Sequence, residues 1–212
     1  QQTGGDYYDW QPLPDGRLIV VLADVTGHGI GPALVMAVCR AYARASSSSA
    51  TNAAKFLAQV NNLIYDDLST TGRFITMVIA IVSPDGLVEL VSAGHGPTLL
   101  YRAATGQVEW FGGDGVPLGI DAAELYEPHR VLQLHPGDAL MLVTDGFMEW
   151  TRKSDGKQFG LERLQQSLRE SATGSARSML DAMDAAVHAF AEGSPQEDDT
   201  TAVAITARQA LA

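Results

Sequence analysis

The stretch FITMVIAIVSPDGLVELVS, residues 74–92, decides the fold. Apolar, β-branched runs over 74–82 and 87–92 are typical of strands. Between them, Ser83-Pro84-Asp85-Gly86 places proline at the second and glycine at the fourth position of a tight turn. A turn this short joins antiparallel neighbours. The stretch therefore predicts an antiparallel hairpin and argues against a doubly wound parallel sheet.

The rest of the chain extends this pattern. Hydrophobic runs predict further strands over 17–24, 99–102, 107–111, 130–134, 139–144 and 200–206, with a second hairpin turning at Thr105-Gly106. Helical periodicity predicts helices over 33–45, 51–68, 160–170 and 176–191, the second one capped by Thr51. Helices gathered in pairs around strands predict an α+β sandwich with two central antiparallel sheets.

Length and composition narrow the class of protein. The 212 residues fit one domain, 1–212, and no apolar run is long enough for a bilayer span. We expect no signal peptide, because no basic segment followed by an apolar stretch opens the chain. The net charge of −11 disfavours nucleic acid and anionic membrane surfaces as partners. The single cysteine, Cys39, gives no sign of an oxidising compartment, so we expect a cytoplasmic protein.

Acidic residues recur where predicted strands end. Asp24 and Asp145 each follow a strand and precede glycines, Asp198-Asp199 precedes the last strand, and Asp6 and Asp9 precede the first long one. Any single Asp-Gly is more often a turn former. Carboxylates that converge, however, repel one another, and Mg²⁺ or Mn²⁺ relieves that repulsion through oxygen ligands. The spacing alone leaves a turn and a metal cluster as even alternatives.

Seven segments, in order and spanning nearly the whole chain, resemble the metal-dependent protein phosphatases of type 2C, in their bacterial sporulation and stress-response branch, which regulates sigma factors. The segments are GGDYYD (4–9), DVTGHG (24–29), FITM (74–77), SAGHGP (92–97), PLG (117–119), TDG (144–146) and DDTT (198–201).

The resemblance implies a four-layer α-β-β-α sandwich with two divalent ions, Mn²⁺ or Mg²⁺, between the sheets. It implies that Asp24 bridges both ions and that the Val25 carbonyl binds one of them. Asp145 and Asp198 would hold the other ion. Asp6 and Asp199 would lie in the outer shell, with Asp198 matching the direct ligand better than its neighbour.

The same resemblance implies a reaction and partners. A water activated by two metal ions would attack the phosphorus of a phosphoserine or phosphothreonine ester, without a covalent phosphoenzyme. The implied substrate is an anti-sigma-factor antagonist. We also expect the chain to be truncated at its start from a longer protein, with a sensor or receiver domain preceding it.

Three residues depart from the family pattern or invite an alternative role. His28 stands four residues after Asp24, where animal members carry a histidine two residues after it. It is a candidate acid or substrate contact, and the alternative is a histidine at a helix start that only lines the site. His95 is interpreted as a turn residue, and Cys39 as a core residue. The arginine that animal members place before the first acidic motif is absent from residues 1–5.

Two other functions stay open from the sequence. A non-catalytic member of the fold would act as a binding or regulatory module, and it predicts the loss of at least one metal aspartate. A different metal-dependent hydrolase would act on a small phosphoester or a nucleotide, but the chain lacks a Walker-type phosphate loop.

Overall fold

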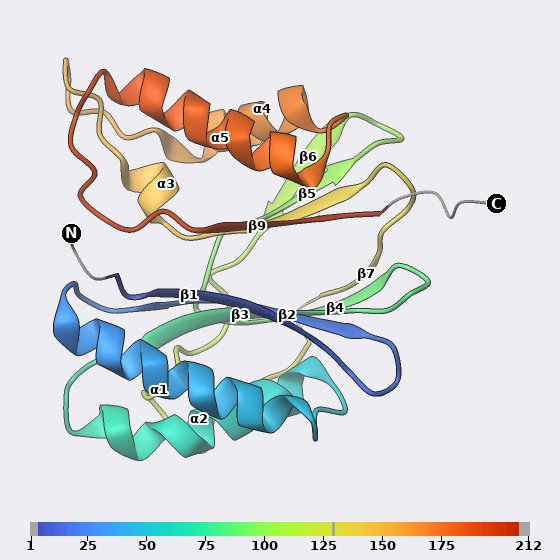
Figure 1. Cartoon of the computed structure of the whole chain (residues 1–212), viewed down its shortest axis with the longest axis vertical. Helices are drawn as coiled ribbons and strands as arrows, with labels where there is room; N and C mark the ends of the chain where they lie inside the picture. Colours follow the sequence, from blue (N-terminus) through green and yellow to red (C-terminus); the bar gives the residue numbers. More distant parts are fainter. Residues whose placement is uncertain (1–3, 129, 208–212) are drawn as a thin grey trace. The chain divides into compact units, whose positions relative to one another are not determined.

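The computed structural model describes residues 4–128 and 130–207, and the chain divides into two compact units (Figure 1). The first unit comprises the described residues of 1–96 and 112–133, and the second unit comprises those of 97–111 and 134–212. Each unit consists of one antiparallel sheet with helices packed against it.

The sheet of the first unit has the strand order β1-β2-β3-β4-β7, with every pair antiparallel. Helices α1 and α2 lie together on one of its faces (Figure 1). The elements are β1 (Asp6–Pro12), β2 (Leu18–Val25), α1 (Ile30–Ser47), α2 (Ala53–Ser69), β3 (Ile75–Val82), β4 (Leu87–Ala93) and β7 (Arg130–Gln133).

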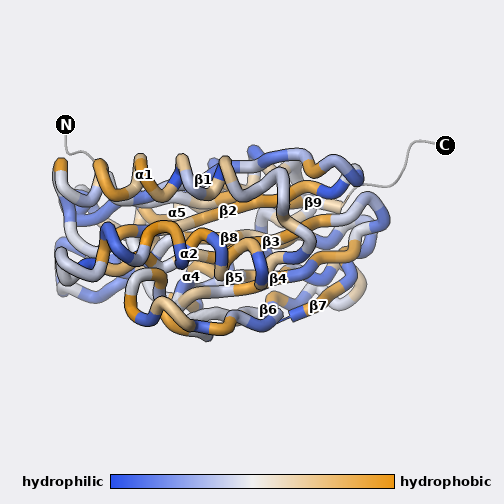
Figure 2. The backbone as a smooth tube through the Cα atoms, turned by 90° about the horizontal axis from the view of Figure 1, so that it is seen from below, coloured by the Kyte–Doolittle hydropathy of each residue, from blue (hydrophilic) through white to orange (hydrophobic). Residues whose placement is uncertain are grey.

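Strands β2 and β3 are almost continuously apolar because both of their faces are buried. Figure 2 shows the hydrophobic colouring of β2. Helix α1 begins after Gly29, whose φ of 95° favours glycine. Helix α2 is capped by Asn52, whose side chain accepts a hydrogen bond from the Lys55 N–H, so the prediction of a Thr51 cap was wrong by one residue.

The sheet of the second unit has the order β6-β5-β8-β9, again antiparallel throughout. Its core joins the inward side chains of the sheet to those of the long helices, including Met141, Leu164 and Met183. The elements are β5 (Thr98–Arg102), β6 (Gln107–Phe111), β8 (Ala139–Val143), α3 (Gly146–Glu149), α4 (Gly160–Ser171), α5 (Ala176–Ala191) and β9 (Ala202–Thr206).

The predicted class, two antiparallel sheets flanked by helices, is confirmed, as are both hairpins. Two elements were not predicted: the edge strand β1, and the short helix α3 where a plain glycine turn was expected. Helix α1 also extends beyond its predicted bounds of 33–45 at both ends. No helix within the described part of the chain combines the length and apolar character needed to cross a bilayer.

Candidate functional site

Two of the predicted acidic residues lie side by side in the first unit. In the β1–β2 ladder, Asp6 is directly opposite Asp24. Opposite residues of an antiparallel pair share a face, with their Cβ atoms about 4.5–5.5 Å apart. The spacing of motifs in the sequence could not give this register, because β1 itself was not predicted.

Gly5 lets the chain pass close to this pair. A Cβ at Gly5 would lie 2.9 Å from the Val25 carbonyl oxygen and 3.3 Å from Oδ1 of Asp24. The Val25 N–H also donates a hydrogen bond of 3.4 Å to the Gly5 carbonyl. Only a residue without a side chain therefore leaves the Asp24 carboxylate and the Val25 carbonyl, two predicted ligands, in this arrangement.

Asp9 has a different role from Asp6. Its side chain is buried and binds Arg44 of α1 through two hydrogen bonds of 2.6 and 2.8 Å, and it also accepts one from the Tyr7 hydroxyl. Because successive residues of a strand point to opposite faces, Asp9 lies on the helix side of the sheet and Asp6 on the other. The Asp9 carboxylate thus neutralises the Arg44 guanidinium on the helix side of the sheet.

The second unit brings together Asp145 and Asp198. Strands β8 and β9 are antiparallel neighbours, and Val143 at the end of β8 pairs with Ala202 at the start of β9. Both acidic residues therefore lie at the same end of the sheet. Burial raises the pKa of Asp145, and the negative charge of Asp198 raises it further.

Gly146 fixes the spacing between these two acidic segments. A Cβ on Gly146 would collide with the carbonyl oxygen of Asp199. Asp199 is thus in contact with the start of α3 through its backbone, and Asp198, its neighbour, is the residue whose charge reaches Asp145.

Glu149 was missed in the sequence. It stands four residues after Asp145, at the end of α3, and its pKa is raised by burial and then by the charges of Asp145 and Asp198. The signal was present as an i, i+4 pair of acids, but it is only visible once residues 146–149 are known to be helical. Glu149 also borders a cleft of about 190 Å³, which is lined by Gly146, Glu149, Trp150, Thr151, Gln158, Gln196, Glu197 and Asp198.

The two singled-out histidines differ in their surroundings. His28 is exposed in the loop between β2 and α1, and its role as acid or substrate contact stays a prediction. His95 is buried: its Nδ1 lies 2.9 Å from the Thr76 hydroxyl, and its N–H donates to Ser92 Oγ. These contacts agree with the interpretation of His95 as a turn residue. Cys39 is buried in the core of the first unit, as predicted.

The donor atoms suit a hard cation. Carboxylate oxygens and a backbone carbonyl are the ligands that Mg²⁺ and Mn²⁺ prefer, and a cation would relieve the repulsion that raises the Asp145 pKa. Within residues 4–128 and 130–207, no group of three or more His, Cys, Asp or Glu side chains could hold a metal ion. The two-metal centre predicted from Asp24, Asp145 and Asp198 draws on both units and stays a prediction.

Comparison with known proteins adds a family. The profile of the family described as Stage II sporulation protein E (SpoIIE) matches residues 14–208. The chain is 29% identical to Phosphoserine phosphatase RsbU of Bacillus subtilis, over 85% of this chain and 52% of that protein. It is 24% identical to Protein IcfG of Synechocystis, over 97% of this chain and 36% of that protein. The chain thus spans between about a third and a half of these relatives.

Solved structures show the same fold. The SiaA-PP2C domain of Pseudomonas aeruginosa superposes with a TM-score of 0.84 at 22% identity, over 96% of this chain and 80% of that one. The RsbU and RsbW domains of Rv1364c from Mycobacterium tuberculosis give 0.77 at 27% identity, over 97% and 55%. A structure of RsbX in complex with magnesium gives 0.69 at 14% identity, over 95% and 86%.

Proposed function

The chain belongs to the SpoIIE family of metal-dependent serine/threonine phosphatases, and on this premise we propose that it removes phosphate from phosphoserine or phosphothreonine on a partner protein. The observation that carries the proposal is the pairing of carboxylates at strand ends, Asp6 with Asp24 and Asp145 with Asp198. Pairs of like charge at the ends of rigid strands are costly unless a cation neutralises them.

The proposed cofactors are two Mn²⁺ or Mg²⁺ ions. Asp24 and the Val25 carbonyl would hold one ion, with Asp24 shared, while Asp145 and Asp198 would hold the other. Asp6 and Asp199 would orient the outer shell. When bound, such ions supply an activated water near neutral pH and neutralise charge on the phosphoryl group. The magnesium in the RsbX structure supports this choice of cation class.

Hydrolysis by water is favoured over a covalent phosphocysteine. Burial raises the pKa of Cys39 to about 12, so the thiol stays protonated at neutral pH. Its side chain also faces the core under α1, away from any substrate. The thiol therefore has neither the charge nor the access that a nucleophile needs.

The proposed substrate is a phosphorylated anti-sigma-factor antagonist in a bacterial signalling pathway of the cytoplasm. The similarity to Phosphoserine phosphatase RsbU supports a phosphoserine protein as substrate. A preceding sensor or receiver domain in the complete protein is part of the same proposal, in line with the greater length of the relatives.

The test is a turnover assay with para-nitrophenyl phosphate and a phosphoserine peptide, in Mn²⁺, in Mg²⁺ and in EDTA. We expect phosphate release with either metal, none in EDTA, and recovery when Mn²⁺ is added in excess. Nucleotides and small phosphoesters serve as competing substrates. Turnover that persists in EDTA contradicts the metal assignment, and preference for nucleotides favours the other class of hydrolase.

The alternative of a non-catalytic binding module is decided by the same assay. A folded protein that binds Mn²⁺ but releases no phosphate from any substrate of the panel would favour the module. The presence of Asp24, Asp145 and Asp198 together favours catalysis.

A further inference from the structure

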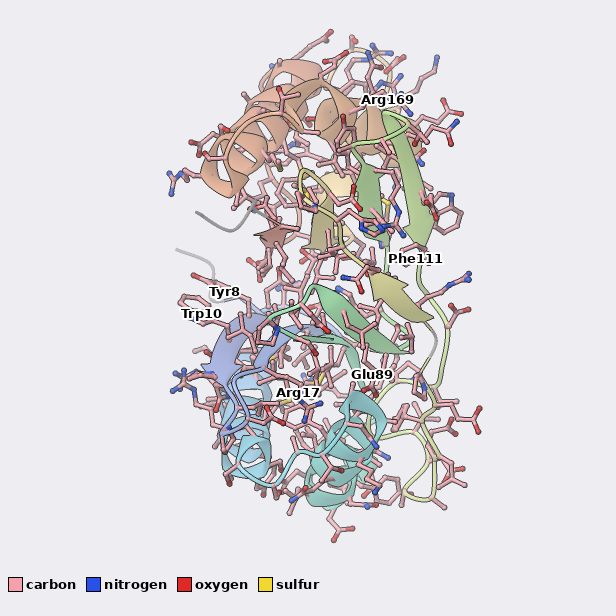
Figure 3. All side chains as sticks on the ribbon, turned by 90° about the vertical axis from the view of Figure 1, so that its right-hand side faces the viewer. Tyr8, Trp10, Arg17, Glu89, Phe111 and Arg169 are labelled. Carbon is pink, nitrogen blue, oxygen red and sulfur yellow. The ribbon has the colours of Figure 1, made fainter. Side chains whose placement is uncertain are left out.

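Two large aromatic side chains stand exposed on β1. Tyr8 is 56% exposed and Trp10 is 60% exposed. Their ring centroids lie 6.4 Å apart with an angle of 19° between the planes, so the rings stack as a pair. Figure 3 shows the two labelled side chains next to each other at the outer margin of the first unit. We call this pair the aromatic shelf.

The aromatic shelf shares a face of the sheet with the candidate site. Along β1, Tyr7 and Asp9 turn toward the helices, where Tyr7 joins the core and Asp9 binds Arg44. Alternation then places Tyr8 and Trp10 on the opposite face, together with Asp6. Asp6 is the partner of Asp24, so the shelf continues the row that contains the predicted metal ligands.

The side chains of β2 that lie opposite the two rings are buried. Leu22, opposite Tyr8, is 0% exposed, and Val20, opposite Trp10, is 2% exposed. Strand β1 is also the outermost strand of its sheet, with no further strand beyond it in the described chain. The shelf thus lies where a sheet edge meets solvent, which is the place where an extended peptide can align with a strand.

Stacked, exposed tyrosine and tryptophan rings are well suited to binding. They offer a large apolar area that loses little side-chain entropy on contact, and these two residue types dominate the energetics of protein interfaces. Neither ring contributes to the hydrophobic core of its unit. The two rings therefore do not pack in the isolated chain, and they would become buried only against a binding partner.

We propose that the aromatic shelf docks the protein substrate, by binding apolar side chains in the extended segment that flanks the phosphorylated residue. This inference rests on the proposed phosphatase function. A strand advances about 3.3 Å per residue, so Tyr8 and Trp10 lie about 7 and 13 Å along β1 from Asp6. An extended substrate has the same rise, and its residues two and four positions from the phosphoserine meet the two rings.

The experiment compares Trp10→Ala with Trp110→Ala. Trp110 lies on β6 of the other unit and is 53% exposed, which makes it a control of matched type and exposure. The probes are short phosphoserine peptides with leucine two and four residues to either side, the same peptides with serine at those positions, and para-nitrophenyl phosphate. Because Trp10 is exposed, its removal leaves the core intact, and a thermal melt verifies this for each variant.

For Trp10→Ala we expect KM to rise about tenfold for a leucine peptide, as for an interface hot spot. The kcat value, and turnover of para-nitrophenyl phosphate, stay at the wild-type level. The serine peptides bind weakly to every protein, and Trp110→Ala behaves as wild type. Equal KM values for Trp10→Ala and Trp110→Ala overturn the proposal, and so does an equal loss of para-nitrophenyl phosphate turnover, which indicates a structural role.

Binding of a fluorescent leucine peptide, measured by polarisation, separates docking from catalysis. If wild type lacks turnover but Trp10→Ala still weakens the peptide Kd, the phosphatase proposal fails and the docking surface stands. Unchanged Kd in Trp10→Ala and Tyr8→Ala removes the docking surface whatever the turnover. Sedimentation tests a second copy as occupant: a dimer that Trp10→Ala dissociates, with peptide KM unaltered, assigns the shelf to self-association and overturns docking.

Discussion

Thr144 and Thr201 join the end of β8 to the approach of β9. The Thr144 N–H donates to the Thr201 carbonyl at 3.0 Å, and the Thr201 N–H donates to Thr144 Oγ1 at 3.0 Å. The two bonds close the ladder immediately before Asp145 and three residues after Asp198. They hold the acidic ends of both segments close together, which explains why the charge of Asp198 raises the pKa of Asp145.

Asp24→Asn is expected to abolish metal-dependent turnover. Loss of an outer-shell partner of a metal site typically costs 10–100-fold, so loss of a shared ligand is expected to cost at least about 100-fold. Asp6→Asn, at a predicted outer-shell residue, is expected to lower turnover by about 10–100-fold. Asp85→Asn, in the turn between β3 and β4, is the control in the same unit. Near-normal rates for Asp24→Asn in saturating Mn²⁺ would remove Asp24 from the metal site.

Two substitutions distinguish the predicted roles of Asp198 and Asp199. The charge of Asp198 raises the Asp145 pKa, so Asp198→Asn should lose at least about 100-fold in turnover and weaken Mn²⁺ binding in a calorimetric titration. Asp199→Asn should lose less, because the contact with Gly146 uses the Asp199 backbone and survives the change. The reverse order of effects would make Asp199 the direct ligand.

Asp9 is expected to make the stability of the fold decrease at acid pH. Burial alone would raise its pKa, but hydrogen bonds from Arg44, Tyr7 and the Trp10 N–H outweigh burial and lower the pKa below the ordinary value. A lowered pKa stabilises the fold above the unfolded-state value of about 3.9, and this contribution is lost as pH falls through the folded-state pKa. Thermal melts in EDTA from pH 7 to pH 2 should show it.

In Asp9→Asn that contribution is absent at every pH. Its melting temperature should lie below that of wild type at pH 7, and the gap should narrow below about pH 4. Asp66→Asn, at an exposed position of α2, is the control. A gap that stays constant down to pH 2 would show that the loss comes from packing and not from charge.

Asn61→Ala is expected to destabilise the first unit by about 2–4 kcal/mol, the cost of two lost hydrogen bonds and an unsatisfied buried N–H. The buried amide of Asn61 donates to the Asp121 carbonyl at 2.8 Å and accepts from the Gly119 N–H at 2.9 Å. Asn62→Ala, at the exposed neighbour, should cost less than about 0.5 kcal/mol. Urea unfolding measures the loss of stability in both variants. Similar values would show that the two hydrogen bonds of Asn61 do not stabilise the unit.

The sequence allowed the interior strands and all four long helices to be predicted, because their apolar periodicity reports burial directly. The edge strand β1 escaped, since an exposed strand with acidic and aromatic residues has no such pattern. Helix α2 shows the same limit on a smaller scale. The apolar Leu63 is 42% exposed, whereas the polar Asn61 is buried because the loop at Gly119 satisfies its amide.

The site was predictable as a set of residues but not as a geometry. Motifs in order pointed to Asp6, Asp24, Asp145 and Asp198. The ladder of β1 and β2 pairs Asp6 with Asp24, whereas Asp145 and Asp198 lie beyond the paired ends of β8 and β9. The register that places Asp6 opposite Asp24 depends on the hydrogen bonds between the two strands. A slip of one residue would move the side chains of the strand to the other face of the sheet. Likewise, the sequence alone does not distinguish Asp9 from Asp6. The alternation of β1 places Asp9 at the ion pair with Arg44 and Asp6 beside Asp24.

The cramped position of Gly146 restricts how this chain can change. Its backbone conformation is one that any residue adopts, so the demand for glycine comes from the Asp199 carbonyl alone. A saturation library at this codon would therefore return glycine unless residues 196–201 were diversified at the same time. A redesign of α3, the helix after Asp145, therefore requires a redesign of the loop over residues 196–201 as well.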